Sequence, residues 1–209
     1  MNLSDYRNEY TKGQLKESDL DAEPRVQFQK WLDEAMQEHA PEPTAMTLST
    51  VNAQGQPTAR IVLLKGYDEH GLAFYTNYSS RKGQELEQNP QACLSFFWPT
   101  MQRQVRFEGR IQRMPRAASE QYFQSRPHAS RISAWASPQS EPISAEALQE
   151  RFEHYLNTLG SNPDCPPHWG GYYLQPDYIE FWQGGRGRLN DRFAYQAEKN
   201  HWHITRLAP

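Results

Sequence analysis

The part of the sequence that most constrains the fold runs over 58–82 and reads T-A-R-I-V-L-L-K-G-Y-D-E-H-G-L-A-F-Y-T-N-Y-S-S-R-K. An unbroken apolar run at 61–64 predicts a strand that is buried on both faces. A turn signal, D-E-H-G, follows at 68–71, and the β-rich run at 72–75 predicts a second strand. The serines at 79–80 can cap a helix. The stretch therefore predicts a strand, a tight turn, a second strand and the start of a helix.

Four cations surround this predicted hairpin. Arg60 and Lys65 bracket the apolar strand, and Arg81 and Lys82 fall in the first turn of the helix. Cations have the wrong sign for a helix N-terminus, where the helix dipole favours anions. The misfit is explained if a bound anion accepts hydrogen bonds from the helix N–H groups and also compensates the side-chain charges. We therefore predict a phosphate site here; the alternative is a solvated basic rim.

Length and composition limit the class of protein. The chain has 209 residues, for which we expect a mobile N-terminal arm over 1–24 and a single domain over 25–209 with a substantial core. A net charge of −3 does not indicate a nucleic-acid partner. Aromatic residues make up 12% of the chain, which suits a planar ligand or a subunit interface.

Two cysteines and two histidines bear on compartment and metal binding. Cys93 and Cys165 lie far apart, which is typical of a reducing compartment without disulfides. The N-terminus lacks the apolar segment of a signal peptide, and no run approaches 18 apolar residues. We therefore expect a cytoplasmic protein that does not associate with a membrane. His201 and His203 share a strand face, but without a third ligand at a recognisable spacing they predict no metal site.

The hydrophobic periodicity predicts a mainly β chain with flanking helices. The predicted helices span 23–39, 80–88, 115–125 and 144–159. The further predicted strands span 45–51, 92–98, 102–112, 169–174, 178–182 and 201–207. The first half should form an antiparallel meander of about five strands. Such a sheet tends to close into a barrel, because closure removes its edges.

Two of the predicted helices carry a single apolar stripe at helical spacing. In the first the stripe consists of Phe28, Trp31, Leu32, Ala35 and Met36. In the last it consists of Leu148, Phe152, Tyr155, Leu156 and Leu159. We expect both helices to pack through these faces.

A second candidate anion site follows the helix predicted to start at Pro115. Tyr122 and Arg126 lie four residues apart, on one helix face. Arg126-Pro127 should end the helix, and Ser130 should follow in a turn. A phenol, a guanidinium and a hydroxyl that converge there suit a second phosphate. The alternative is an ordinary helix C-terminus with a favourable arginine.

The C-terminal part contains a glycine-rich turn at 184–187. It lacks G-K-[S/T] and a following helix, so it predicts neither a P-loop nor a dinucleotide-binding fingerprint. If the next segment is extended, Arg188, Asn190 and Arg192 point to the same face.

Eight blocks of the sequence, in order along the chain, resemble the pyridoxamine 5′-phosphate oxidase family. They are R-I-V-L-L-K (60–65), Y-T-N-x-x-S-R-K (75–82), R-Q-V (103–105), Y-F-x-S-R-P (122–127), Q-S (139–140), I-E-F-W-Q-G-G (179–185), R-L-N-D-R (188–192) and R-L-A-P (206–209). The resemblance implies an antiparallel split β-barrel that forms a homodimer, with FMN at the subunit interface. It also implies oxidation of pyridoxamine 5′-phosphate or pyridoxine 5′-phosphate by O2 to pyridoxal 5′-phosphate, with release of H2O2 and, from the amine, ammonia.

The resemblance also implies roles for individual residues. The expected FMN-binding residues are Arg60, Ile61, Val62, Leu63, Leu64, Lys65, Tyr75, Thr76, Arg81, Lys82, Gln104, Gln139, Ser140, Trp182 and Arg192. The expected substrate-binding residues are Arg7, Asn8, Glu9 and Tyr10 as a lid, Lys65, Tyr122, Arg126 and Ser130 at the phosphate, and Arg188, Leu189 and Asn190 over the ring. Arg188 and Asn190 are the expected catalytic residues.

One position departs from the family pattern. The family usually has histidine where this chain has Asn190, and asparagine cannot titrate near neutral pH. Two other readings of the sequence remain open. One is a different split-barrel flavin oxidoreductase, which would need no second phosphate site. The other is a non-catalytic protein that binds FMN or pyridoxal phosphate.

Overall fold

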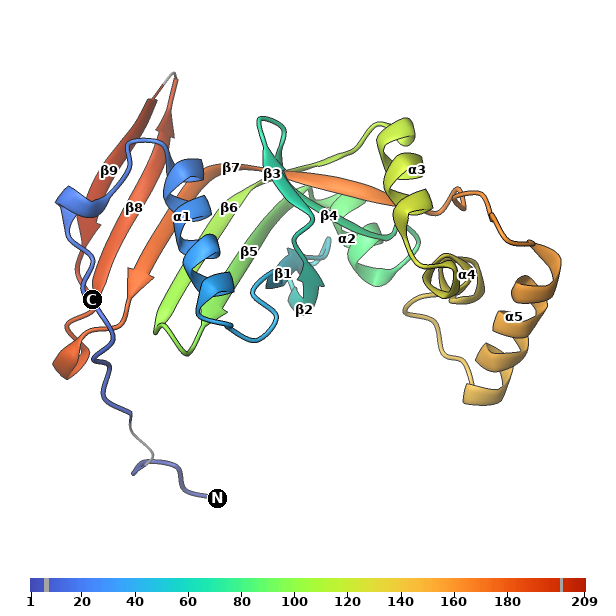
Figure 1. Cartoon of the computed structure of the whole chain (residues 1–209), viewed down its shortest axis with the longest axis horizontal. Coiled ribbons are helices and arrows are strands. Elements are labelled where there is room, and N and C mark those ends of the chain that lie inside the picture. Colours follow the sequence, from blue (N-terminus) through green and yellow to red (C-terminus); the bar gives the residue numbers. More distant parts are fainter. Residues whose placement is uncertain (6–7, 200) are drawn as a thin grey trace. The chain divides into compact units, whose positions relative to one another are not determined.

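The computed structural model describes residues 1–5, 8–199 and 201–209. Its helices are α1 (Pro24–Gln37), α2 (Arg81–Gln88), α3 (Arg116–Ser125), α4 (His128–Ala136) and α5 (Ala145–Thr158), with 3-10 turns at Glu17–Asp19 and Arg186–Arg188. Its strands are β1 (Ala45–Val51), β2 (Pro57–Leu63), β3 (Gly66–Asp68), β4 (Gly71–Asn77), β5 (Gln91–Trp98), β6 (Arg103–Arg113), β7 (Trp169–Gln183), β8 (Asp191–Glu198) and β9 (His201–Leu207) (Figure 1). None of the helices described is long and apolar enough to span a membrane.

The strands form one hydrogen-bonded sheet in the order β2-β1-β5-β6-β7-β4-β3, and β8 pairs with β7 and with β9. The expected meander of the first half is therefore wrong. Strand β7, from the C-terminal half, lies between β6 and β4, so the pairing joins segments that are distant in sequence. The mainly β character with flanking helices is confirmed.

The chain divides into two compact units. We call the first, Met1–Leu48, Cys93–Gly109 and Pro176–Pro209, the α1 unit. We call the second, Ser49–Ala92 and Arg110–Gln175, the pocket unit. The expectation of an arm over 1–24 before a single domain stays a prediction.

Helix α1 supplies much of the core of its own unit. The ring of Phe28 lies 5.0 Å from that of Phe96 and 5.0 Å from that of Phe107. Trp31 contacts Phe181 of β7 edge to face at 5.3 Å. The predicted α1 stripe is confirmed except at its last residue, since Met36 is 45% exposed.

In the pocket unit, β3 and β4 form a hairpin across the predicted turn, but its first strand is not the apolar run at 61–64, because β2 pairs with β1 instead. Asp68 pairs with Gly71 across the turn. Gly71 has φ +115°, and a Cβ there would lie 2.1 Å from the Leu174 carbonyl oxygen, so both the turn and the approach of β7 require glycine. Strand β4 then pairs antiparallel with the start of β7, with Tyr75 opposite Gly171.

Strand β2 is not buried on both faces, contrary to the prediction. Its exposure alternates, and the apolar side chains of Ile61 and Leu63 are 64% and 39% exposed. An apolar run indicates burial only if both faces are covered, and β2 lies at one end of the strand order. Leu64 is buried, but it follows the last residue of the strand.

Two further predictions about elements are wrong, and one condition set in the sequence analysis is not met. Ser130 lies in helix α4 rather than in a turn, because Pro127 stands at the N-cap and begins a new helix after the break. Strand β7 is continuous over 15 residues, where two strands were expected. The segment 188–192 is not extended throughout, because it leaves a 3-10 turn at Arg188, which has φ +62°.

Helix α5 matches its predicted bounds and its cap, where Ser144 Oγ accepts a hydrogen bond from the Ala147 N–H at 3.1 Å. Its apolar stripe is less covered than expected. None of the residues of α5 is buried, and Leu148 and Leu156 are 37% and 41% exposed. The helix lies beside α4 (Figure 1).

Candidate functional site

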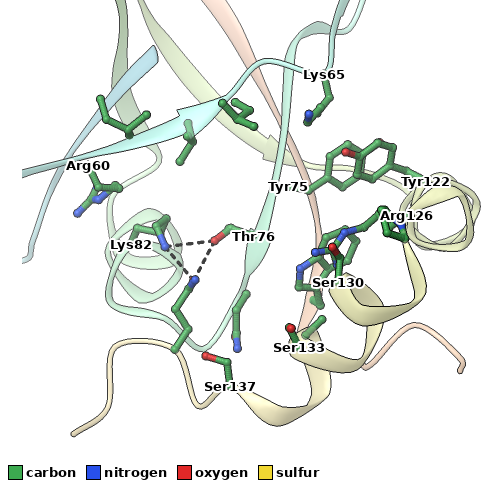
Figure 2. Close-up of a pocket in the computed structure, with 18 residues that line it drawn as sticks. Arg60, Lys65, Tyr75, Thr76, Lys82, Tyr122, Arg126, Ser130, Ser133 and Ser137 are labelled. Carbon is green, nitrogen blue, oxygen red and sulfur yellow. Dashed lines mark hydrogen bonds between the residues drawn. The ribbon is translucent and has the colours of Figure 1, made fainter. Parts of the chain in front are cut away.

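The pocket unit contains a cavity of about 800 Å³, a size typical of small-molecule sites. Strands β2 and β4, helices α2, α3 and α4, the loop after α4 and the start of β7 contribute its walls. The lining residues are Arg60, Ile61, Val62, Leu63, Lys65, Tyr75, Thr76, Asn77, Lys82, Tyr122, Arg126, Pro127, Ser130, Ser133, Ala134, Ser137, Gln139 and Trp169. Figure 2 shows its polar side chains in two groups that face one another.

The first group, which we call the α2 side, consists of Arg60, Thr76, Lys82 and Gln139. The Lys82 ammonium donates to Gln139 Oε1 at 2.9 Å and to Thr76 Oγ1 at 3.2 Å (Figure 2). Lys82 is only 9% exposed. Burial, with a contribution from the nearby Arg60, lowers the pKa of Lys82 to about 8. A buried cation whose partners are neutral oxygen atoms is a strong point of attraction for an anion.

Helix α2 brings Lys82 to this wall because Ser80 caps its N-terminus. Ser80 Oγ accepts from the Gly83 N–H at 3.4 Å, as the sequence predicted. Arg81, the other cation of the first turn, points elsewhere. Its Nε donates to Glu85 at 2.9 Å, and its side chain is 57% exposed and does not line the cavity.

The second group, which we call the α4 side, consists of Tyr122, Arg126 and Ser130, with Lys65 nearby (Figure 2). Within the described residues, Arg126 Nη1 is buried and has no hydrogen-bond partner. The guanidinium carbon lies 4.6 Å from the centre of the Trp169 ring. Burial lowers the pKa of Arg126. The α4 side therefore offers an unused charged donor, which a phosphate can accept.

Aromatic rings support the α4 side. Tyr75 of β4 stacks on Tyr122 of α3 at 3.8 Å and lies parallel to Trp169 of β7 at 5.5 Å. Burial raises the pKa of Tyr75 to about 12, so this phenol stays neutral at physiological pH. The stack fixes the helix that carries Arg126 against the sheet.

The charge of the lining is one-sided. Arg60, Lys65, Lys82 and Arg126 are cationic, and none of the described lining residues is a carboxylate. The cavity is therefore suited to anions and holds its cations in two places.

Twelve of the 25 residues predicted for the site are brought together here. They are Arg60, Ile61, Val62, Leu63, Lys65, Tyr75, Thr76, Lys82, Gln139, Tyr122, Arg126 and Ser130. Leu64, Arg81 and Ser140 do not line the cavity. Ser140 has φ +78° and accepts from the backbone N–H of Arg81 at 3.2 Å, so it supports the start of α2.

The sequence did not single out six further lining residues, Asn77, Pro127, Ser133, Ala134, Ser137 and Trp169. Ser133 and Ala134 were missed because α4 was not predicted. The signal was present, because a proline at the start of a helix with serines three residues apart predicts one polar helical face. Trp169 has no such local signal, since only the pairing of β7 with β4 brings it to the cavity.

The other predicted residues belong to the α1 unit. Gln104 lies on β6 and is partly exposed. Trp182 and Arg192 are directly opposite each other on β7 and β8. The Arg192 guanidinium is held by the buried Glu180, with Nε 2.8 Å from Oε1. Arg188 is exposed.

The loop between β7 and β8 is closed by its own side chains. Asn190 Oδ1 accepts from the Gly185 N–H at 3.1 Å, and Leu189 is 74% exposed. The N-terminal segment contacts this loop. Glu9 Oε1 accepts from the Gly187 N–H at 2.5 Å.

Of the other predicted lid residues, Tyr10 lies edge to face with Trp182 at 5.6 Å. Asn8 is exposed, and Arg7 lies outside the described residues.

Two family models match the chain. Residues 32–152 match pyridoxamine 5′-phosphate oxidase, and residues 169–209 match the pyridoxine 5′-phosphate oxidase C-terminal dimerisation region. The second match supports a homodimer.

Curated relatives match over the full length. The chain is 52% identical over 210 residues to the pyridoxine/pyridoxamine 5′-phosphate oxidase of Bordetella pertussis (strain Tohama I), with 100% of both chains covered. It is 50% identical over 211 residues to the enzyme of that name from Janthinobacterium sp. (strain Marseille), again with 100% of both covered.

Solved structures share the fold. PhzG from Burkholderia lata 383, in complex with tetrahydrophenazine-1-carboxylic acid, has a TM-score of 0.87 and 30% identity and covers 92% of this chain and 95% of that chain. An FMN-binding protein related to pyridoxamine 5′-phosphate oxidase, from Nostoc punctiforme PCC 73102, has a TM-score of 0.73 and 21% identity, with 91% and 100% covered. The expected split-barrel fold is confirmed, and the chain belongs to the pyridoxamine 5′-phosphate oxidase family.

Proposed function

We propose that this protein is an FMN-dependent oxidase that converts pyridoxamine 5′-phosphate and pyridoxine 5′-phosphate to pyridoxal 5′-phosphate. O2 is the final acceptor, and the products include H2O2 and, from the amine, ammonia. The observation that carries the proposal is the cavity with two separate cationic sides. The reaction needs two bound phosphates, one on the cofactor and one on the substrate.

The α2 side fits the phosphate of FMN. Lys82 is buried among neutral oxygen atoms and lies near Arg60, so a bound dianion would compensate both charges. Thr76 and Gln139 hold the ammonium in place and add polar contacts. When bound, FMN supplies the two-electron acceptor, and the protein supplies binding and orientation.

The α4 side fits the phosphate of the substrate. Arg126 Nη1 has no hydrogen-bond partner among the described residues, and Tyr122 and Ser130 offer hydroxyl groups beside it. Lys65 can add a further charge from the end of β2. A phosphate clamped there would convert remote binding energy into alignment of the reacting part of the substrate.

Roles for the remaining predicted residues are supported by the family resemblance, and all of these residues except those at 7–10 lie in the matching blocks. We assign Leu64, Arg81, Gln104, Ser140, Trp182 and Arg192 to the cofactor site, with some of them contributed by the second subunit of a homodimer. We assign Arg188, Leu189 and Asn190 to the substrate ring and Arg7, Asn8, Glu9 and Tyr10 to a lid. Arg188 would orient the substrate and favour loss of its alcohol or ammonium proton.

We further propose that the protein acts in the cytoplasm, in pyridoxal phosphate biosynthesis. The two free cysteines, Cys93 and Cys165, are compatible with a reducing compartment.

The test is direct. The FMN-loaded protein is incubated in air with pyridoxine 5′-phosphate, and the absorbance of the aldehyde product is followed together with O2 uptake. We expect aldehyde and H2O2 in equal amounts. Pyridoxine without its phosphate serves as a matched control and should react far more slowly, since the α4 side would be left without its ligand. An FMN-loaded protein that forms no aldehyde would be a binding protein or an oxidoreductase for another substrate.

A further inference from the structure

Glu85 lies behind the α2 side and does not line the cavity. The residue is 4% exposed. Its Oε2 accepts from Thr50 Oγ1 at 2.5 Å, from Thr58 Oγ1 at 2.7 Å and from Arg60 Nη2 at 3.3 Å. Its Oε1 accepts from Arg81 Nε at 2.9 Å. One buried carboxylate therefore ties β1 and β2 to helix α2.

Two opposite effects on anion binding are possible for this carboxylate. By Coulomb's law alone, a negative charge close to an anion site weakens binding of the anion. A carboxylate that fixes the surrounding cations strengthens binding, because those cations lose less freedom when the ligand arrives. The sign of the net effect therefore reveals which of the two dominates.

The geometry favours the second effect, in which Glu85 strengthens anion binding by fixing the surrounding cations. Burial raises the pKa of Glu85, but hydrogen bonds from Thr50, Thr58 and Arg81 and the charge of Arg60 outweigh it and lower the pKa to about 2. The carboxylate is thus ionised at all physiological pH values, and its charge is compensated by its own donors. Arg60, which also donates to Thr50 and Thr58 at 2.5 and 2.6 Å, is held on several sides.

We infer that Glu85 is a positioning residue for the cofactor phosphate and acts through Arg60, which lines the cavity. The inference rests on the proposed function, because it takes FMN as the ligand of the α2 side.

The role of Glu85 should also be visible in the pH dependence of FMN affinity, through its effect on Lys82. Two charged groups act on it, Arg60, which lowers its pKa, and Glu85, which raises it. Its other contacts, Thr76, Ser80 and Gln139, are neutral. Without the Glu85 charge the pKa of Lys82 falls further. The affinity lost on neutralising Glu85 should therefore grow as the pH rises.

The experiment compares FMN affinity in the apoprotein, measured by quenching of flavin fluorescence at several pH values. Glu85→Gln keeps the shape of the side chain and removes its charge. We expect its Kd for FMN to rise about tenfold at pH 7, in line with loss of hydrogen bonds to charged groups, and to rise more at pH 8.5. The matched control is Glu87→Gln on the same helix, where Glu87 is exposed and pairs with Arg113 at 2.8 Å. Its Kd should stay within about twofold of wild type.

A Kd that is unchanged or lower in Glu85→Gln overturns the inference. A purely structural role would lower the unfolding temperature of the apoprotein and leave the Kd of the folded protein unchanged. Arg60→Gln provides the second test, because Glu85→Gln should add little to the Kd in that background if Glu85 acts mainly through Arg60. If Glu85→Gln does not fold, Glu85→Asp replaces it, and its retained charge should keep the wild-type pH profile.

The wild-type control separates the two hypotheses. Failure of the wild-type apoprotein to bind FMN rejects the proposed function. Tight wild-type binding together with an unaffected Glu85→Gln variant rejects only the role of Glu85.

Discussion

The two sides of the cavity bind charge in different ways. On the α2 side, Lys82 donates to three neutral oxygen atoms, and Glu85 holds Arg60 from behind. On the α4 side, Arg126 lies over Trp169 and keeps one buried donor without a partner among the described residues. One side is organised by hydrogen bonds before any ligand binds, and the other keeps a donor available.

The difference suits one ligand that stays bound and another that binds and leaves in each reaction cycle. A preorganised site lowers the cost of ordering side chains and favours a ligand that stays bound, as a cofactor does. An unsatisfied donor gains its hydrogen bond only when the ligand is present, so its contribution depends on that ligand. We therefore expect variants on the two sides to change two different binding constants.

The largest effect is expected at Lys82. Lys82→Met removes the buried ammonium and should raise the Kd for FMN about 100-fold, since hydrogen bonds to a charged group contribute about 1.5–3 kcal/mol. At saturating FMN the KM for pyridoxine 5′-phosphate should change little. Fluorescence titration and steady-state kinetics measure the two constants. The exposed Lys30→Met serves as the control. A large rise in the KM for pyridoxine 5′-phosphate with unchanged FMN affinity would contradict this assignment. It would mean that the α2 side binds the substrate phosphate.

The next effect is expected at Arg126. Arg126→Lys keeps the charge but loses the planar donor pair, and the KM for pyridoxine 5′-phosphate should rise about tenfold or more. The Kd for FMN should stay the same. Arg131→Lys on the next helix, α4, is the control, because Arg131 does not line the cavity. Equal losses in both binding constants would mean that the two sides are not separate.

A moderate effect is expected from pH. The pKa of Lys82 is lowered to about 8, so the ammonium is protonated below that pH and is lost as the pH rises through it. The FMN phosphate binds more tightly to the protonated ammonium of Lys82 than to the neutral amine. The affinity for FMN should therefore be constant below pH 8 and fall by up to about tenfold per pH unit above it. Titrations from pH 6.5 to 9.5 test this. In Lys82→Met the fall around pH 8 should disappear.

The smallest effect is expected outside the cavity, at Asn190. Its amide oxygen accepts from the Gly185 N–H and has no titratable proton. In Asn190→His, kcat should change by less than about threefold, because we assign loss of the substrate proton to Arg188 and not to this position. A pH-dependent rise in kcat of tenfold would show that this position can carry a proton in the reaction.

The α2 side was predictable because its signals are local. The cations lie close together in the sequence, and the cap at Ser80 fixes where Lys82 falls on its helix. The same pattern could not predict that Arg81 turns away to Glu85, because that choice depends on the position of a carboxylate one turn later in the folded helix. The burial of β2 was misjudged for a related reason, since an apolar run does not reveal whether anything covers it.

The α4 side was only half predictable. Tyr122 lies on the predicted helix, but Arg126 is the extended C-cap residue of that helix. The proline after Arg126 was taken as an end and is also the start of α4. Trp169 is brought to the site by the pairing of β7 with β4, which joins segments almost a hundred residues apart. Sequence patterns describe single elements well, whereas pairing between distant strands needs the structure.

The most direct test of two separate phosphate sites is equilibrium dialysis of pyridoxal 5′-phosphate against the FMN-loaded protein. We predict that one FMN and one pyridoxal 5′-phosphate bind per chain at the same time, and that Arg126→Lys releases only the second. If the two compounds displace each other in proportion to their concentrations, they share one phosphate site and the account is wrong.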